Sequence, residues 1–201
     1  MLVPCSSFAM PKSHTLRFGE RESSPMSTFA GFRSLWIVFG VQDIVSTRKM
    51  STTHSKCCGP GYDFLKLDGG MTEILRSALY GAQHAIVTVA RDDEEESANV
   101  ETSEYVVVGK CCESGDLLTP EAKKPHLIRP RKLRKTRVGD FVVVEATGAY
   151  CSSMSAKHYN SFPSSPEVLL LGPSVEDSRL ICERETFADV VAREIPLRSR
   201  D

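Results

Sequence analysis

Residues 105–116 read Tyr-Val-Val-Val-Gly-Lys-Cys-Cys-Glu-Ser-Gly-Asp, an apolar run that leads directly into a turn of small and polar residues. The run predicts a buried strand, and the turn places two thiols and a carboxylate at its end. A thiol beside a carboxylate suits a site where the thiol transfers a proton and the carboxylate binds a cationic substrate. The structural alternative is a strand end with inert cysteines, followed by an ordinary Ser-Gly-Asp turn.

Two further segments carry related patterns. Residues 68–80 read Asp-Gly-Gly-Met-Thr-Glu-Ile-Leu-Arg-Ser-Ala-Leu-Tyr, and residues 148–154 read Gly-Ala-Tyr-Cys-Ser-Ser-Met, with Tyr-Asn-Ser-Phe-Pro following at 159–163. In order and spacing, residues 61–195 resemble the C-terminal domain of the alanine-racemase-like, pyridoxal-phosphate-dependent decarboxylases. The diaminopimelate decarboxylases are the most similar, with the patterns D-x-G-M-x-x-L-x-R-P-x-L-Y, G-x-x-C-E-S-G-D and G-A-Y-x-x-x-M-x-x-x-Y-N.

The resemblance implies roles for five residues. Cys112 matches the family's proton-donating cysteine, which protonates the α-carbon after carbon dioxide has left a substrate bound to pyridoxal phosphate. Glu113 and Arg76 match the residues that bind the distal ammonium and the distal carboxylate of diaminopimelate, since arginine holds carboxylates through paired hydrogen bonds. Tyr80 matches a substrate contact, and Tyr150 matches a tyrosine that reaches the cofactor.

Other interpretations of these residues remain open. Without the resemblance, Glu113 and Arg76 are ordinary surface charges, and the two tyrosines are aromatic residues at the edge of the core. Ornithine and arginine decarboxylases are alternatives, but the ornithine enzymes follow the cysteine with Asp-Gly, so Glu-Ser-Gly-Asp favours diaminopimelate. Cys111 is interpreted as a small buried hydrophobic residue. Ser77 replaces the family's proline after the arginine, which loosens the backbone beside Arg76.

The composition argues against several classes of function. A chain of 201 residues allows one domain, with or without an extension. The formal net charge of −1 gives no argument for a nucleic acid or an acidic membrane as partner. No run approaches the roughly 18 apolar residues needed to cross a bilayer, since the apolar run at residues 35–41 has only seven. The basic residues 129–137 lack interleaved aromatic residues, so they predict a solvated loop rather than a phosphate-binding patch.

The cysteines and histidines predict neither a disulfide framework nor a metal site. Seven cysteines, an odd number, indicate reduced thiols in a reducing compartment. Their adjacent pairs lack the two-residue gap typical of zinc ligands. His84 and His158 lie near the motifs and are interpreted as loop or surface histidines. The seven cysteines are Cys5, Cys57, Cys58, Cys111, Cys112, Cys151 and Cys182.

Residues 1–60 differ in composition from residues 61–201. They are rich in serine and threonine and contain few acidic residues, which favours an organellar transit peptide, such as one for a plastid. The alternatives are a low-order extension on a cytoplasmic protein, or sequence upstream of an internal start at Met26 or Met50. The predicted domain boundary therefore lies after residue 60.

Residues 61–201 predict a mostly β domain, either a barrel or a sandwich. The resemblance implies the same, because this half of the decarboxylases is a β-rich module beside a (β/α)8 barrel. Residues 91–103 and 120–135 predict exposed polar segments. Strands are expected at 62–67, 85–90, 104–110, 141–146 and 167–171, with a short helix at 73–80 and an amphipathic helix within 185–195.

The 201 residues are too few to include the barrel domain that the resemblance implies. Roughly 60 residues cannot form a barrel of about 250, and Lys49 and Lys56 lack strand context, so neither is expected to hold the cofactor. We therefore expect the chain alone to be inactive and pyridoxal phosphate to bind only where a barrel domain completes the site. The family's shared active site implies a homodimer, or docking on a full-length subunit. The alternative is a non-catalytic interaction module that pairs with a complete decarboxylase.

Overall fold

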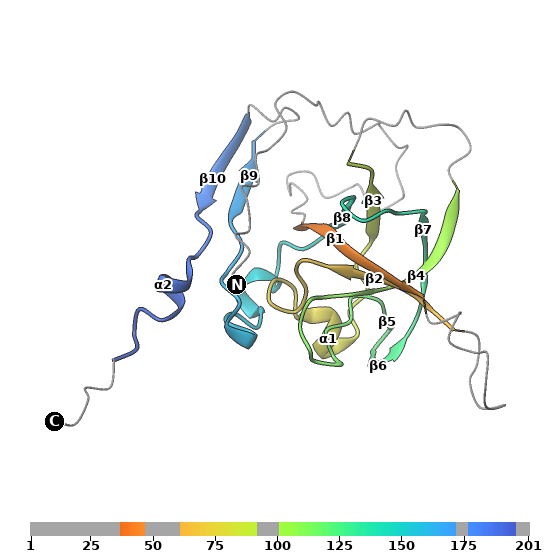
Figure 1. The fold of residues 1–201 in the computed structure, drawn as a ribbon, viewed down its shortest axis with the longest axis horizontal. Coiled ribbons are helices and arrows are strands. Elements are labelled where there is room, and N and C mark those ends of the chain that lie inside the picture. The colour runs from red at the N-terminus through yellow and green to blue at the C-terminus, as the bar shows by residue number, and fades with distance from the viewer. Residues whose placement is uncertain (1–36, 47–60, 92–100, 172–176, 196–201) are drawn as a thin grey trace, which may run out of the picture. The chain divides into compact units, whose positions relative to one another are not determined.

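The computed structural model of the chain describes residues 37–46, 61–91, 101–171 and 177–195. Strands dominate these residues, which confirms the predicted mostly β fold (Figure 1). The strands are β1 (Ile37–Ser46), β2 (Asp63–Leu67), β3 (Ile86–Val89), β4 (Thr102–Val108), β5 (Pro120–Glu121), β6 (Lys124–Ile128), β7 (Arg131–Arg134), β8 (Phe141–Val144), β9 (Glu167–Leu170) and β10 (Ser178–Cys182). The helices are α1 (Arg76–Tyr80) and α2 (Phe187–Val190), with single 3₁₀ turns at Ser152–Met154 and Tyr159–Ser161.

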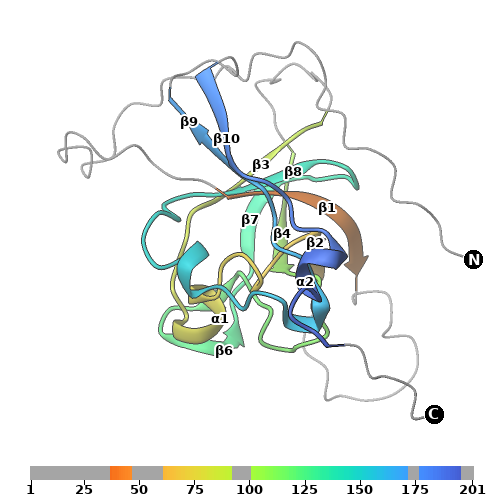
Figure 2. The ribbon, with the colours of Figure 1, turned by 90° about the vertical axis from the view of Figure 1, so that its left-hand side faces the viewer.

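Six of these strands form one sheet in the order β3-β8-β1-β2-β4-β7. Neighbouring strands are antiparallel except β2 and β4, which are parallel and therefore need the long crossover formed by residues 68–101. The two edge strands, β3 and β7, contact each other, so the sheet curls into a nearly closed barrel. In both ribbon views, α1 lies beside β6 at one end of this barrel (Figures 1 and 2).

Strand β1 joins the two halves of the sheet. Its residues 37–40 pair with β8, whereas residues 41–46 pair with β2. A bulge between Val41 and Asp43 marks the change of partner. Beside it, the Gly40 amide donates to Asp68 Oδ1 at 2.9 Å, and the Asp68 amide donates to the Gly40 carbonyl at 3.0 Å. A strand that lies before residue 61 therefore joins the two halves of the barrel.

This strand corrects the predicted domain boundary. Residues 1–60 were expected to form a low-order extension, but Phe39 and Val41 in β1 lie in the core of the sheet, 3% and 4% exposed. The domain therefore begins at or before residue 37. Most of the segment proposed as a transit peptide, with Lys49 and Lys56, lies outside the described residues.

The core fills the inside of the curled sheet. Alternate residues of β2 and β8 face inward, as the period of a strand requires. Leu133 in β7 is also buried, which corrects the prediction that residues 129–137 form a solvated loop. The buried cluster comprises Phe39, Val41, Leu65, Leu67, Ile74, Tyr105, Val107, Leu118, Leu133, Val142, Val144 and Cys151.

Two other parts of the described chain differ from the predictions. Residues 120–135 are not a polar excursion, because β5 pairs with β6 and β7 joins the main sheet. Helix α2 begins with a capping box between Thr186 and Asp189 but covers only four residues. Its apolar side is exposed, with Phe187 at 69% and Ile195 beyond it at 90%.

Residues 166–184 form a compact unit of their own. In this unit, β9 pairs antiparallel with β10, with a bulge between Leu180 and Cys182. The sequence predicted β9 but not β10. None of the helices in the described part of the chain is long and apolar enough to span a membrane.

Candidate functional site

The loop of residues 109–116 is organised by one buried side chain, Asp116. Its Oδ1 atom accepts a hydrogen bond from the Met71 amide at 2.7 Å, and its Oδ2 atom accepts one from the Cys111 amide at 2.9 Å. The carboxylate lies against the α-carbons of Gly70 and Gly109, where any added Cβ would collide with it. Burial raises the pKa of Asp116, and the two backbone hydrogen bonds oppose this rise. Asp116 thus ties the loop to the turn that carries Met71.

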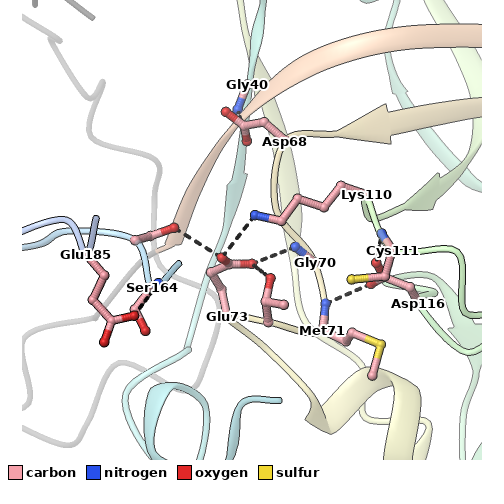
Figure 3. A network of polar contacts seen from close by, with 12 residues as sticks. Gly40, Asp68, Gly70, Met71, Glu73, Lys110, Cys111, Asp116, Ser164 and Glu185 are labelled. Atoms are coloured by element: carbon pink, nitrogen blue, oxygen red, sulfur yellow. Dashed lines mark hydrogen bonds and ion pairs between the residues drawn. The ribbon is translucent and has the colours of Figure 1, made fainter. Parts of the chain in front are cut away.

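A second carboxylate, Glu73, joins the same loop to a third segment of the chain (Figure 3). Its Oε2 atom accepts hydrogen bonds from the Gly70 amide at 2.8 Å and from the Thr72 hydroxyl at 2.5 Å. Its Oε1 atom lies 3.6 Å from Lys110 Nζ and accepts a bond from the Ser165 hydroxyl at 3.1 Å. The Lys110 and Glu73 side chains are only 13% and 9% exposed, so this ion pair is shielded from water. The network fixes the base of the loop.

The two adjacent cysteines have different environments. Burial, followed by the Asp116 carboxylate, raises the pKa of the Cys111 thiol to about 12, so Cys111 stays protonated at neutral pH. Cys112 is exposed, and its Sγ atom accepts a hydrogen bond from Asn160 Nδ2 at 3.4 Å. Of the two thiols, only Cys112 is presented to a ligand.

Glu113 lies next to Cys112 as an exposed, ionised carboxylate. Its Oε1 atom accepts hydrogen bonds from the Gly115 amide at 3.0 Å and the Ser114 hydroxyl at 3.2 Å. Its Oε2 atom accepts a bond from the Tyr159 hydroxyl at 3.4 Å. These hydrogen bonds, with that from Gly115 the largest cause, hold the pKa of Glu113 below its ordinary value. The loop end therefore combines a thiol with a permanent negative charge, which suits a cationic ligand.

Arg76 and two tyrosines form a second group. The Arg76 Cζ atom lies 5.9 Å from the centroid of the Tyr80 ring and 5.8 Å from that of Tyr150, within the range of cation–π contacts. Tyr150 adopts a left-handed backbone conformation with φ of 59° and is 63% exposed. The three side chains line an open cavity of about 700 Å³, together with His84 and Lys123. An anionic group in this cavity would meet positive charge and aromatic rings.

The structure therefore brings the five predicted site residues together as two groups rather than one. Cys112 and Glu113 lie on the loop after β4, and Arg76, Tyr80 and Tyr150 line the cavity beside α1. No hydrogen bond or ion pair joins Arg76 directly to Glu113. The loop end offers a negative charge to a cation and the cavity offers a positive charge to an anion, which suits a ligand that carries both.

Two residues that contact the loop, Tyr159 and Asn160, were not predicted as part of the site. Tyr159 and Asn160 were quoted only as part of a pattern, but they contact Glu113 and Cys112. His158 is an exposed turn residue, as predicted, and its Nε2 atom lies 2.7 Å from a Glu185 carboxylate oxygen. The sequence held one signal for this turn, Asn160 in a polar stretch, because asparagine tolerates the left-handed backbone conformation that the residue adopts. In the described ranges, no group of three or more His, Cys, Asp or Glu side chains is placed to hold a metal ion.

A model of a known family matches residues 35–148, more than half of the chain, and is described as the pyridoxal-dependent decarboxylase, C-terminal sheet domain. The chain belongs to this family. The match to the decarboxylase sheet domain begins at residue 35, in agreement with β1 and not with the boundary predicted after residue 60.

The relatives of this sheet domain include diaminopimelate decarboxylases. That of Buchnera aphidicola (subsp. Acyrthosiphon pisum, strain APS) is 36% identical over 129 residues, which cover 64% of this chain and 29% of that protein. That of Escherichia coli K12 is 34% identical over 157 residues, covering 77% and 33%.

Solved structures agree. One crystal structure of a diaminopimelate decarboxylase has a TM-score of 0.62 and 31% identity, covering 79% of this chain and 33% of that one. The enzyme from M. jannaschii in complex with L-lysine has a TM-score of 0.57 and 27% identity, covering 81% and 30%. The chain therefore spans about a third of the length of the relatives it matches.

Proposed function

We propose that the chain is the C-terminal part of a pyridoxal-phosphate-dependent decarboxylase that converts meso-diaminopimelate to L-lysine and carbon dioxide in lysine biosynthesis. The observation that carries the proposal is the loop end, where an exposed thiol lies beside an ionised carboxylate inside the family's sheet domain. The relatives named above, all diaminopimelate decarboxylases, support the choice of substrate.

In this proposal both groups bind the distal amino-acid head of the substrate. Glu113 accepts hydrogen bonds from the distal ammonium. Its lowered pKa keeps the Glu113 carboxylate ionised at neutral pH, so the ammonium meets a full negative charge. Arg76 binds the distal carboxylate, and the Tyr80 and Tyr150 rings hold the guanidinium in place. Cys112 donates its thiol proton to the α-carbon after decarboxylation and regains a proton from solvent.

The residues of the cavity fit one side of a pyridoxal phosphate site. Tyr150 presents an exposed ring and hydroxyl beside a guanidinium, which suits contact with an anionic aromatic cofactor. When bound, the cofactor supplies the electron-withdrawing ring that makes loss of carbon dioxide feasible. In this proposal the cofactor lysine belongs to a barrel domain beyond these 201 residues, so the chain alone is inactive and acts with a barrel, within a dimer or on a full-length subunit.

A chimera tests the proposal. The sheet domain of the Escherichia coli relative would be replaced by residues 35–195 of this chain, and release of lysine from meso-diaminopimelate would be measured. We expect activity in the chimera and a loss of about 100-fold or more in kcat for Cys112→Ala, because proton transfer by a positioned side chain contributes that much. Cys111→Ala is the matched control and should remain active.

The substrate assignment has its own variant. Glu113→Gln should raise KM for diaminopimelate, because it removes the charge that pairs with the distal ammonium. If a folded, cofactor-loaded chimera prefers ornithine or arginine, that amino acid replaces diaminopimelate as the assigned substrate. One without any decarboxylase activity would contradict the proposal altogether.

A non-catalytic interaction module is the second candidate. The observation in its favour is the exposure of Leu79, Tyr80 and Tyr150 at or next to the cavity, at 47%, 51% and 63%. Sedimentation of the chain mixed with a full-length decarboxylase would show whether the two associate. Association that changes the activity of the partner, together with an inactive chimera, would favour this candidate.

We also propose that the residues before β1, the first part of the 1–60 segment, address the protein to an organelle, a plastid being the first candidate, on the strength of their composition. The test is a fusion of residues 1–36 to a fluorescent protein. Import with cleavage supports the proposal, and a diffuse cytoplasmic signal contradicts it.

A further inference from the structure

We infer that Tyr159 and Asn160 are positioning residues for the loop end, Asn160 for the Cys112 thiol and Tyr159 for the Glu113 carboxylate. The inference rests on the proposed function of Cys112 and Glu113. It assigns a purpose to a strained turn that contacts the site from a distant part of the sequence.

The contacts form two parallel pairs. Two consecutive residues of the turn, Tyr159 and Asn160, bind two consecutive residues of the loop, Glu113 and Cys112. The Tyr159 hydroxyl lies 3.4 Å from Glu113 Oε2, and the Asn160 amide nitrogen lies 3.4 Å from Cys112 Sγ. Each contact joins residues more than 40 positions apart, so the loop end is oriented by the turn as well as by its own backbone.

The turn holds an unfavourable backbone conformation. His158, Asn160 and Ser161 have φ values of 61°, 54° and 59°, in the left-handed region that costs most residues free energy. Such conformations persist only where surrounding contacts impose them, and they concentrate at functional sites.

The contacts that impose this conformation are also present. His158 Nε2 lies 2.7 Å from Glu185 Oε2, and the same carboxylate accepts a hydrogen bond from the Ser164 amide at 2.8 Å. The Glu185 amide in turn donates to the Ser164 carbonyl at 3.2 Å. Both ends of the turn are therefore fixed, and the strain is held where Tyr159 and Asn160 meet the loop.

The chemistry of the two contacts suits positioning. An amide N–H that points at sulfur aims the sulfur in one direction, whichever protonation state it is in. Desolvation, followed by the charge of Glu113, raises the pKa of Tyr159, so its hydroxyl remains a donor at neutral pH. Asn160 thus acts on the proton donor, and Tyr159 acts on the substrate-binding carboxylate.

The test is the rate at which iodoacetamide alkylates Cys112 in the full 201-residue chain, with the site located by tandem mass spectrometry. Asn160→Gly removes the amide and tolerates the left-handed backbone. We expect it to slow alkylation of Cys112 by about threefold to tenfold, the effect of one lost hydrogen bond to sulfur. If Asn160 only shields the thiol, the glycine variant reacts faster, and an unchanged or faster rate overturns the inference.

Two further variants separate positioning from folding. Ser161→Gly relaxes the neighbouring left-handed residue, leaves Asn160 in place and should keep the Cys112 rate within about twofold. Asn160→Asp keeps the side-chain shape but replaces the donor with an acceptor, so it should slow alkylation of Cys112. The slowing should persist at high salt, where the added charge is screened. Local unfolding would instead expose Cys111 and speed its alkylation, which the same spectra record.

Tyr159→Phe tests the other contact by NMR titration of Glu113 in chain labelled at glutamate. Loss of the hydroxyl should move the pKa of Glu113 upward, toward its ordinary value, and no movement overturns this half of the inference. Neither readout depends on decarboxylation. If Asn160→Gly slows alkylation but the chimera is inactive, positioning is supported and the proposed function fails. If the chimera is active but Asn160→Gly leaves alkylation unchanged, only the positioning inference is overturned.

Discussion

At the scale of single residues, the loop end depends on two glycines that leave room for Asp116. A Cβ added at Gly70 would lie 2.3 Å from Asp116 Oδ1 and 2.7 Å from the Gly109 α-carbon, and one at Gly109 would lie 2.2 Å from Oδ2. Neither neighbour can move away easily, because Asp116 is 3% exposed and binds two backbone amides. The carboxylate and the two glycines therefore act as one packed unit.

Gly70→Ala should accordingly destabilise the domain. The expected loss is about 1–3 kcal/mol of unfolding free energy, the usual cost of forcing an extra methyl group into a packed site. Urea unfolding followed by circular dichroism would measure it. Gly115→Ala is the control, since its Cβ would lie 3.6 Å from the nearest atom, in ordinary contact, and should change stability by less than about 0.5 kcal/mol. Equal effects of the two variants would contradict the packing argument.

Glu185 should make the stability of the domain depend on pH. The hydrogen bond from the Ser164 amide, followed by that from His158, lowers the pKa of Glu185 from 4.5 to about 2. Because the folded state holds the lower pKa, the stabilisation is complete above the ordinary pKa and disappears as the pH falls toward 2. Glu185→Gln should therefore lower the melting temperature at pH 6 but not at pH 2.

Thermal melts between pH 2 and 7 would test this dependence. Glu183→Gln, which changes an exposed neighbour, serves as the control and should leave the melting curve nearly unchanged at every pH. A difference between Glu185→Gln and the parent chain that persists at pH 2 would show that the carboxylate charge is not responsible.

At the scale of elements, β1 is the strand that sequence reasoning did not find. Its apolar run, residues 35–41, was judged only as a membrane span and rejected for its length. The segments on both sides are rich in serine and threonine, and no turn signal marks where the strand begins. Its partners, β2 and β8, are about 20 and 100 residues further along, so local pattern could not reveal the pairing.

Two neighbouring positions in β1 test its place in the fold. Phe39→Ala should cost about 3–5 kcal/mol of unfolding free energy, as for other buried phenylalanines. Val38→Ala, one residue earlier and 58% exposed, should cost less than about 1 kcal/mol. Chemical denaturation of both variants gives the comparison. A neutral Phe39→Ala would restore the domain boundary after residue 60.

The elements that were predicted correctly share one property, a visible apolar pattern. Strands β2, β3, β4 and β8 are rich in valine, isoleucine, leucine or phenylalanine, and each was placed within two residues of its observed ends. Strand β7 was missed because Arg131, Lys132 and Arg134 surround its single buried residue, Leu133. Helix α2 was predicted too long, because helical spacing continues to Ile195 although that side chain has no apolar surface to cover it in the described chain.

The candidate site was predictable to the extent that motifs carried it. Cys112, Glu113 and Arg76 were chosen because their motifs resemble a family, and the structure places them in two groups. The contacts from Tyr159 and Asn160 could not be predicted, because they depend on left-handed backbone angles that asparagine tolerates but does not dictate. The burial of Glu73 and Lys110 could likewise not be predicted, because it arises only where three segments distant in the sequence come together.

At the scale of the whole molecule, exposed apolar surface beside the cavity should govern self-association. Leu79→Lys, in α1 next to Tyr80, should reduce light scattering of the concentrated chain, because it breaks an exposed apolar patch. Val138→Lys changes a more exposed apolar residue, 63% against 47% for Leu79, whose neighbours in sequence do not line the cavity, and is the control. If both variants reduce scattering equally, general surface hydrophobicity and not this patch is the cause.

The divided pairing of β1 also sets an order of events during synthesis. The first half of β1 pairs with β8, and Gly40 meets Phe141 about 100 residues later in the chain. A ribosome that adds about 5–20 residues per second therefore needs about 5–20 s to deliver that partner. Throughout this interval β8 does not cover the side chains of Phe39 and Val41, and the nascent chain exposes an unpaired apolar strand. A chaperone that shields the emerging segment until β8 arrives would therefore limit its aggregation.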